Sequence, residues 1–199
     1  NVPTGKDSLS MKQKYKNEEV IAPGTVIISA AGHCNNINKV VEPVLQKKGG
    51  SIYYINISED NFKLGGSSFS QILNTIGNEV PTVKNATYVK TVFNTLQQLI
   101  SEEKIVAGHD VASGGLITTL LEMCFADVNL GAVLDFSDFD EKDPIKILFS
   151  ENCGIVFQAS IDEDVQSKLI TNNISFKKIG FVEKGNLLTI KFSKEHIET

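Results

Sequence analysis

The hydrophobic and polar positions of the 199-residue chain fall into short segments, each of which predicts one secondary-structure element. Apolar runs rich in β-branched residues, such as 25-TVIISAA-31, indicate strands. Apolar residues spaced three and four apart, as in 86-ATYVKTVFNTLQQLISEE-103, indicate helices that bury one face. The predicted strands cover residues 8–15, 25–31, 51–57, 105–108, 131–136, 153–160, 176–183 and 187–192. The predicted helices cover residues 37–48, 69–76, 86–103, 114–125, 143–150 and 162–173.

The order of these elements predicts an α+β fold, with one mixed β-sheet and helices packed against it. Strands and helices alternate irregularly, which argues against a doubly wound parallel sheet. The last two strands, on either side of 184-KGN-186, are interpreted as a local hairpin. The run 25–31 is interpreted as a buried strand, and Pro43 should kink or shorten the helix 37–48.

The domain organisation is predicted from one connection and from the start of the chain. The segment 16-KNEEVIAPG-24 is charged and contains proline and glycine, which is typical of a boundary. We therefore expect residues 1–22 to be a strand and linker, and residues 23–199 to form the main domain. Because the chain does not begin with Met, we interpret it as a piece of a longer polypeptide.

Charge and composition exclude several classes of partner. The net charge of −5 and the pI of about 5.3 provide no basic surface for nucleic acid or for an anionic membrane. No apolar run approaches the roughly 20 residues that span a bilayer, and no signal peptide is visible, so we expect a cytoplasmic protein. The three cysteines have no C-x-x-C pair, and Cys124 and Cys153 are expected to be buried and inert.

A carboxylate lies at the tip of the predicted strand 105–108, just before a turn of small residues. A helix that begins near Ser113, Gly114 and Gly115 offers backbone N–H groups to an anion. Asp110 would repel a bare phosphate, but it can hold a Mg²⁺ ion that bridges phosphate oxygens. The loop therefore fits a Mg-nucleotide site, although the spacing alone favours a turn that Asp110 caps and the glycines shape.

The opening stretch 4-TGKDSLSM-11 places Lys6, Asp7 and Ser8 on one tight loop. Charge and a hydroxyl together can bind phosphate or metal at such a loop. An exposed polar turn explains the same three residues equally well.

Two further stretches can each be interpreted either as part of a binding site or as ordinary local structure. The loop 64-LGGSSFSQ-71 leads into a helix and can hold an anion or only turn the chain, and it is not a P-loop because no lysine follows its glycines. Glu151 lies between two apolar elements, either in a site or as a solvated carboxylate at a helix end.

Taken in chain order, six stretches resemble the phosphoribosylformylglycinamidine synthase family of purine biosynthesis. They are TGKDSLSM, PGTVIISAAG, LGGSSFSQ, GHDVASGGL, LEMCFA and LFSENCG. The match covers nearly the whole chain and is similar to the later of the two synthetase repeats in the large, single-chain form. This family belongs to the aminoimidazole-ribonucleotide-synthetase-like superfamily, and the resemblance implies that superfamily's C-terminal α/β domain. Residues 1–16 resemble the closing strand of the N-terminal half-domain.

The resemblance implies an ATP-dependent ligase. The family converts formylglycinamide ribonucleotide, glutamine and ATP into formylglycinamidine ribonucleotide, glutamate, ADP and phosphate. Its cofactors are Mg²⁺ and ATP or ADP, and its partners would be the remaining synthetase and glutaminase domains of the same polypeptide together with small-molecule substrates. The isolated chain is expected to have no synthetase activity and little affinity for nucleotide.

The resemblance also suggests roles for single residues. Asp110 matches a Mg²⁺ ligand of the family, in a nucleotide site that is structural in the later repeat. The family has a serine contact two places further on, but this chain has Ala112, so Ser113 would have to replace it. Lys6, Asp7 and Ser8 match a GKDS motif near the cleft, and Glu151 matches the acidic position of an LF-x-E segment. No residue is assigned a catalytic role.

Two alternatives to the ligase remain open. The chain would then be a non-catalytic half that carries a structural Mg-nucleotide site within the same enzyme, or it would belong to another synthetase or kinase of the superfamily. The stretch GKDSLSM argues against the second alternative.

Overall fold

The computed structural model describes residues 4–8, 11–21 and 25–192, which fall into two compact units, 1–38 and 39–199. In the first unit, β1 (Thr4–Ser8) pairs antiparallel with β4 (Thr25–Ser29), and β2 (Lys12–Tyr15) pairs antiparallel with β3 (Glu18–Ile21). A 3-10 helix, η1, covers Ile37–Lys39. The expected boundary between residues 22 and 23 remains a prediction, since this division describes compactness alone.

Two predictions about the strands of the first unit were wrong. The single strand predicted over 8–15 is instead the end of β1 followed by the separate strand β2. The strand at 25–31 was expected to be buried, but Val26 is 68% exposed and Ile28 is 67% exposed. The reason is that, in the described part of this unit, β4 pairs with β1 alone and no helix covers its apolar side chains.

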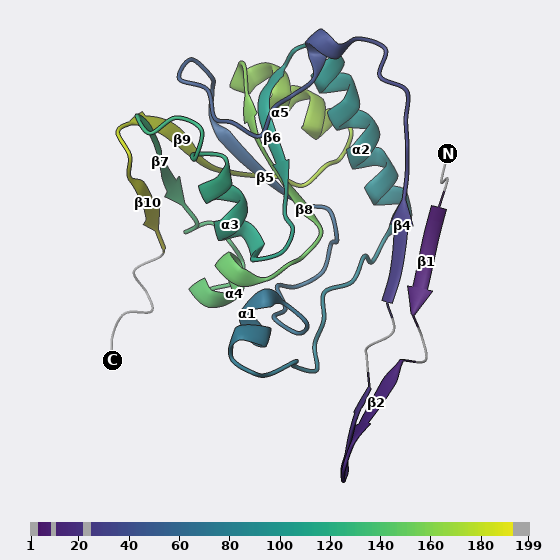
Figure 1. Ribbon diagram of the computed structural model, residues 1–199. Coiled ribbons are helices and arrows are strands. Elements are labelled where there is room, and N and C mark those ends of the chain that lie inside the picture. The colour runs from purple at the N-terminus through teal and green to yellow at the C-terminus, as the bar shows by residue number, and fades with distance from the viewer. Residues whose placement is uncertain (1–3, 9–10, 22–24, 193–199) are drawn as a thin grey trace. The chain divides into compact units, whose positions relative to one another are not determined.

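The second unit is built around a six-stranded mixed sheet with the strand order β10-β7-β9-β5-β8-β6 (Figure 1). Its strands are β5 (Ile52–Asn56), β6 (Ile105–Asp110), β7 (Leu130–Asp135), β8 (Gly154–Ala159), β9 (Lys177–Lys184) and β10 (Leu188–Lys191). Its helices are α1 (Ser68–Ile72), α2 (Ala86–Ser101), α3 (Gly115–Glu122), α4 (Pro144–Phe149) and α5 (Asp162–Thr171). The predicted α+β class is therefore confirmed.

No two strands that follow one another in the chain are neighbours in this sheet. The hairpin predicted for the last two strands was wrong, because β7 lies between β9 and β10. β7 pairs antiparallel with β9 and parallel with β10. The turn that follows β9 wraps around the start of β7, where Gly185 N–H donates to the Asn129 carbonyl at 2.9 Å and Ala132 N–H donates to the Leu187 carbonyl at 3.1 Å.

Helices cover both faces of the sheet and bury two apolar cores. On one face, Tyr54 of β5 packs in a cluster with Leu116 and Leu120 of α3 and Ile147 of α4. On the other face, the cluster contains Tyr53 of β5 and residues of α2 and α5, namely Val92, Leu96, Leu99, Val165 and Leu169. Because neighbouring strand residues point to opposite faces, Tyr53 and Tyr54 belong to different cores.

The helix predicted over 37–48 was wrong, because only η1 is helical and residues 40–50 form an irregular segment. Pro43 lacks the N–H that a helix needs and disfavours helical backbone before it. The segment is held by tertiary contacts instead. Leu45 is buried and its N–H donates to the Met123 carbonyl at 3.0 Å, while Gln46 exchanges hydrogen bonds with the side chain of Gln158.

The predicted starts of several helices are confirmed by their caps. The Ser67 side chain caps α1 by accepting from Ser70 N–H, and Asn85 caps α2. α4 begins with Pro144 at its first position after Asp143, as the sequence indicates. Local signals of this kind fix helix starts, because they involve only residues next to one another in the chain.

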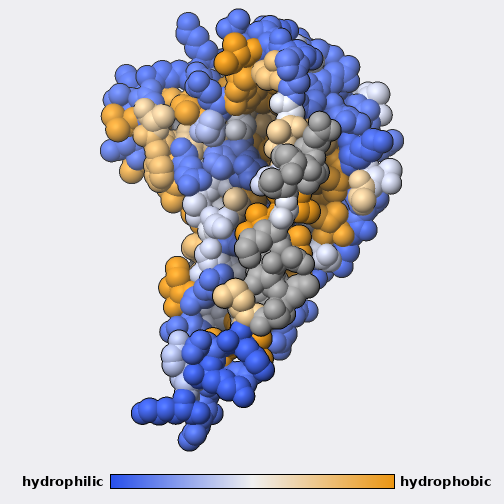
Figure 2. Space-filling model, turned by 45° about the vertical axis from the view of Figure 1, so that its right-hand side comes forward, coloured by the Kyte–Doolittle hydropathy of each residue, from blue (hydrophilic) through white to orange (hydrophobic). Residues whose placement is uncertain are grey.

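Hydrophilic residues cover most of the surface in the view of Figure 2, and apolar residues form separate patches between them. None of the described helices is long and apolar enough to cross a membrane. All three cysteines are free thiols. Cys153 is exposed and Cys124 is half-buried, so the expectation that both are buried was wrong for Cys153.

Candidate functional site

Asp110 is the last residue of β6, an edge strand of the sheet, and its carboxylate is directed to solvent. The predicted strand 105–108 is therefore two residues longer than expected. The backbone is paired with β8, where Asp110 is opposite Ile155 and Val111 N–H donates to the Gly154 carbonyl at 2.9 Å. Because the Asp110 side chain is 78% exposed, its oxygens are available to a ligand.

Contacts with α3 hold the backbone of Asp110 in place. The His109 ring nitrogen Nδ1 lies 2.8 Å from the Asp110 carbonyl oxygen, and Nε2 lies 3.2 Å from the Glu122 carboxylate. The hydroxyl of buried Thr119 donates to the same carbonyl at 3.1 Å. The strand tip is thus fixed, while His109, at 3.4 Å, is the one ion-pair partner of the Asp110 carboxylate among the described residues.

The turn between β6 and α3 requires glycine at two positions. Gly114 and Gly115 have φ angles of 91° and 77°, which lie in the left-handed region. A Cβ at Gly114 would collide with the side chain of Thr118. A Cβ at Gly115 would lie 2.7 Å from the backbone oxygen of Leu148. The small residues therefore let the start of α3 pack directly on α4.

Glu151 joins the starts of two helices. Its Oε1 atom accepts a hydrogen bond from Ser68 N–H, in the first turn of α1, and from Gly114 N–H, at the start of α3, each at 2.8 Å. Carboxylates are stabilised at helix N-termini because the unpaired N–H groups and the helix dipole are positive there. The two glycine-containing loops of the sequence, 64–71 and 113–115, thus meet at one carboxylate.

The structure brings five of the predicted site residues to one corner of the second unit: Asp110, Ser113, Gly114, Gly115 and Glu151. Two of the backbone donors expected to bind an anion are engaged within the protein. Gly114 N–H binds Glu151, and Gly115 N–H donates to the Ala112 carbonyl at 3.0 Å. Ser113 is exposed, and its hydroxyl makes no hydrogen bond within the described part of the chain. Their binding of a nucleotide stays a prediction.

The other three predicted residues, Lys6, Asp7 and Ser8, belong to the first unit. They were expected on a tight loop but form part of strand β1, opposite Ile27, Val26 and Thr25 of β4. The extended backbone separates them, because successive strand residues rise by about 3.3 Å. Their role in a nucleotide site remains a prediction.

Asp110 fits the requirements of a single Mg²⁺ ligand. Mg²⁺ in proteins is held through one or two carboxylates together with phosphates and water, and the Asp110 carboxylate is exposed and accepts no backbone hydrogen bond in the described structure. Within residues 4–8, 11–21 and 25–192, no group of three or more His, Cys, Asp or Glu side chains could hold a metal ion by itself.

A polar network behind this corner was missed by the sequence analysis. The amide of buried Asn152 donates to the Ser58 hydroxyl at 3.1 Å and to the Asn61 carbonyl at 3.0 Å. Asp60 is buried and forms ion pairs with Lys63 at 2.9 Å and with Lys84 at 3.3 Å. These contacts lower the pKa of the Asp60 carboxyl to about 2, with the Lys63 hydrogen bond as the largest cause.

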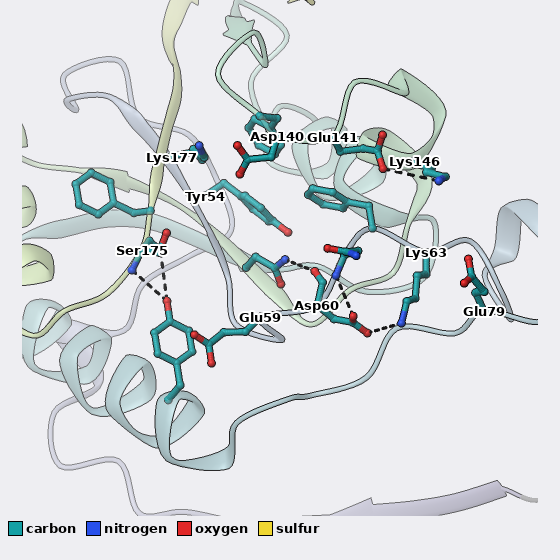
Figure 3. A pocket seen from close by; sticks show the side chains of 16 residues that line it. Tyr54, Glu59, Asp60, Lys63, Glu79, Asp140, Glu141, Lys146, Ser175 and Lys177 are labelled. Carbon is teal, nitrogen blue, oxygen red and sulfur yellow. Dashed lines mark hydrogen bonds and ion pairs between the residues drawn. The ribbon is translucent and has the colours of Figure 1, made fainter.

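A hollow of about 620 Å³ next to this network was also missed (Figure 3). Tyr54 lies in its floor with Phe62 and Phe139, and the three rings stack on one another with centroid distances of 5.7 to 6.3 Å. The available signal was the change from the apolar strand 51–57 to the polar stretch that follows it. That change predicts a strand end but not which distant residues complete a hollow there.

A comparison with protein families matches residues 47–193 to the family described as AIR synthase related protein, C-terminal domain. A protein of Caenorhabditis elegans named probable phosphoribosylformylglycinamidine synthase is 39% identical over 88% of this chain. A protein of Arabidopsis thaliana with the same name, qualified as chloroplastic/mitochondrial, is 38% identical over 94% of this chain. The chain spans 14% and 13% of the lengths of these two relatives.

Solved structures show the same fold. The structure of PurLQS from Thermotoga maritima matches 88% of this chain, and this chain covers 27% of that one, with a TM-score of 0.60 and 14% identity. The T. maritima PurL complexed with ADP also matches 88% of this chain, covering 27% of that chain, with a TM-score of 0.58 and 10% identity. At this level of identity the likeness supports the fold alone, including the mixed sheet with helices.

Proposed function

The chain belongs to the family of AIR synthase related proteins, whose C-terminal domain it carries, and we propose that it is a segment of a phosphoribosylformylglycinamidine synthase. The observation that carries this proposal is 38–39% identity, over most of the chain, to two proteins with that name. The complete protein would use ATP and glutamine to convert formylglycinamide ribonucleotide into formylglycinamidine ribonucleotide. The remaining synthetase and glutaminase domains would be its partners, because this chain spans only 13–14% of such a protein.

We propose that the corner around Asp110 faces a Mg-nucleotide. The exposed Asp110 carboxylate would hold the ion, and the ion would neutralise phosphate charge when bound. A neighbouring solved protein has ADP bound, which supports a nucleotide site in this fold family. The further ligands would come from other segments, since the described residues contain no complete metal-binding group. A cytoplasmic location also remains a prediction, because the relative of A. thaliana is named chloroplastic/mitochondrial.

The backbone N–H groups at this corner are already hydrogen-bonded within the protein, which favours a binding role for the corner over a catalytic one. Gly114 N–H is already bound by Glu151, and Ala112 supplies no hydroxyl. The protein therefore offers the phosphates few groups from this loop beyond Asp110 and Ser113. Such a site would stabilise the folded protein through its bound nucleotide, by the linkage between binding and folding.

The proposed role of Asp110 is tested by substituting this residue in the full-length enzyme. Asp110→Asn removes the charge with little change of shape, and Asp138→Asn makes the same change on an exposed loop as a control. A structural site predicts a lower melting temperature, loss of bound nucleotide and near-normal turnover per folded molecule. A catalytic site predicts lost turnover at an unchanged melting temperature. Normal turnover, nucleotide content and melting temperature together would contradict any role of Asp110 in nucleotide binding.

A further inference from the structure

The hollow beside β5 has a floor of aromatic rings and an unpaired hydroxyl. Tyr54 is only 3% exposed, and so is Phe139, while Phe62 is half-buried beside them. The Tyr54 side chain is buried, but its hydroxyl oxygen is not among the buried unpaired atoms of the described residues and makes no hydrogen bond within them, so this oxygen is open to the hollow. In Figure 3 this hydroxyl points into the space that the labelled side chains surround. The hydroxyl is therefore free to hydrogen-bond to a ligand that enters the hollow.

The rim of the hollow has an excess of negative charge. Five acidic side chains and three lysines line it. The lysines are already engaged: Lys63 pairs with Asp60 at 2.9 Å, Lys177 donates to the Asp138 carbonyl at 2.7 Å, and Lys146 lies 3.8 Å from Glu141.

Three of the acidic side chains have no such partner. Glu59, Glu79 and Asp140 form neither an ion pair nor a side-chain hydrogen bond within the part of the chain that the structure describes. In Figure 3, Asp140 and Glu59 lie on opposite sides of Tyr54. Both residues are exposed, so a cation at the mouth of the hollow would meet unpaired carboxylates next to the aromatic rings.

Burial raises the pKa of Tyr54, with a further contribution from Cys153, so its hydroxyl stays neutral at physiological pH. A neutral hydroxyl can accept an N–H hydrogen bond from a cation and can donate one in turn. The volume of about 620 Å³ lies within the range of small-molecule sites and is far larger than one water molecule requires. Together, these properties describe a site for a small, flat, hydrogen-bonding cation.

We propose that this hollow is a binding site for a guanidinium group, held between Asp140 and Glu59, stacked on the Phe62 ring and hydrogen-bonded to the Tyr54 hydroxyl. Guanidinium fits better than ammonium because it is planar, weakly hydrated and able to stack on aromatic faces while donating several hydrogen bonds. The group can come from a free small molecule or from an arginine side chain of another segment of the longer protein. This site is separate from the proposed nucleotide corner and does not depend on it.

The test uses a pair of probes that differ in charge. The 199-residue chain is titrated with butylguanidinium and, separately, with butylurea, a neutral compound of nearly the same shape, by calorimetry and two-dimensional NMR. We expect saturable binding of butylguanidinium in the millimolar range and at least ~10-fold weaker binding of butylurea, since loss of one charge-assisted contact corresponds to about that factor. Raising the salt concentration should weaken the binding of butylguanidinium.

Three substitutions locate the site. Asp140→Asn and Glu59→Gln should each weaken binding about 3- to 10-fold, and Tyr54→Phe should weaken it by a similar factor because only the hydroxyl is removed. Asp138→Asn carries the same charge change just outside the hollow and should leave the affinity unchanged. Melting curves confirm that each variant is folded. The proposal is overturned if no saturable binding occurs up to about 50 mM probe, or if the variants bind like Asp138→Asn.

The same titration of the full-length enzyme distinguishes a free guanidinium compound from an arginine side chain as the occupant of the hollow. If butylguanidinium binds both proteins, the site takes a free ligand. If it binds the 199-residue chain but not the full-length enzyme, and replacing arginines of the other segments with lysine restores binding, an arginine fills the site. If binding in the full-length enzyme is absent and no arginine exchange restores it, an arginine is excluded as the occupant and the proposal fails for the complete protein.

Discussion

The Oε1 atom of Glu151 accepts the backbone N–H of Gly114 at 2.8 Å, so that a carboxylate occupies the place at the start of α3 where an anionic ligand would bind. The same oxygen accepts Ser68 N–H from α1, while Oε2 makes no hydrogen bond within the described residues. The protein thus supplies its own anion at this corner. Glu151 is therefore expected to stabilise the junction of the two helices.

Replacing Glu151 should lower stability. Glu151→Ala leaves two backbone N–H groups without their charged acceptor, and we expect a loss of about 2 kcal/mol in the free energy of unfolding. Glu151→Gln keeps an acceptor oxygen and should lose about half as much. Urea unfolding at pH 7 measures both, with the exposed Glu183→Ala as control. Equal stability of Glu151→Ala and the control would show that the two hydrogen bonds are not formed in solution.

Gly115 should not tolerate any side chain. Gly115→Ala combines a φ of 77° with a Cβ placed 2.7 Å from the Leu148 backbone oxygen, and we expect a loss of about 3 kcal/mol. Gly185→Ala is a matched control, because its φ of 132° is also positive but no atom lies within 4 Å of the added Cβ. It should lose only about 1 kcal/mol. Similar losses in both variants would mean that backbone strain alone, and not close packing on α4, determines the cost.

Gln158 is a fully buried side chain that ties the irregular segment 46–50 to β8. Its amide nitrogen donates to the carbonyls of Gln46 and Gly50, at 2.9 and 3.2 Å, and its oxygen accepts Gln46 N–H at 2.8 Å. Gln158→Leu leaves these three groups unpaired and should lose about 3 kcal/mol. Gln98→Leu, on the exposed face of α2, should change stability by less than about 0.5 kcal/mol. Chemical denaturation of the two variants tests the difference.

Stability should fall steeply at acidic pH because of Asp60. Its pKa is about 2 in the folded protein and near 3.8 without its partners. A carboxyl group whose pKa is lowered by folding stabilises the folded state above about pH 4, and this contribution is lost as the pH falls toward 2. The urea midpoint of the native protein should therefore decrease between pH 4 and pH 2. Asp60→Asn should have a lower midpoint at pH 6 and a shallower decrease.

Asp162 should contribute to the same acid transition. Burial raises the pKa of its carboxyl, but hydrogen bonds from Ser51 and the ion pair with Lys178 at 2.9 Å outweigh burial, and the resulting pKa is about 2. Asp162→Asn should flatten the pH dependence over the same window, whereas Asp138→Asn should not. A midpoint that decreases equally in all three proteins would assign the acid transition to other groups.

Local features of the fold could be predicted from the sequence. Asn85 and Ser67 cap helices where the pattern places helix starts, and the tip of β6 carries Asp110 before a glycine turn as expected. These features depend on neighbouring residues, so their signals are contained in short stretches. The pairing partner of a strand cannot be predicted from a short stretch, because it lies far away in the sequence. The position of β7 between β9 and β10 depends on pairings such as Leu130 with Lys184. Neither of the two sequence stretches contains a signal that predicts such a pairing.

The candidate site was predictable in part for the same reason. Asp110 and Glu151 each stand out beside apolar elements, but the contact between Glu151 and Gly114 links residues 37 positions apart. The segment 37–48 was predicted as a helix because Val40, Val41 and Val44 have helical spacing, although tertiary contacts override it. Tyr54 gave no signal at all, since an aromatic residue in an apolar strand is ordinarily a core residue.

The strand order has a consequence for how the second unit folds. Every neighbouring pair in the six-stranded sheet joins residues 45 or more positions apart, as Asp110 with Ile155 and Ile52 with Gly180 show. Long chain loops must close before any of these pairs can form, and proteins with such high contact order fold slowly. We therefore expect refolding on the scale of seconds rather than milliseconds, and no stable intermediate from a chain that stops before β8.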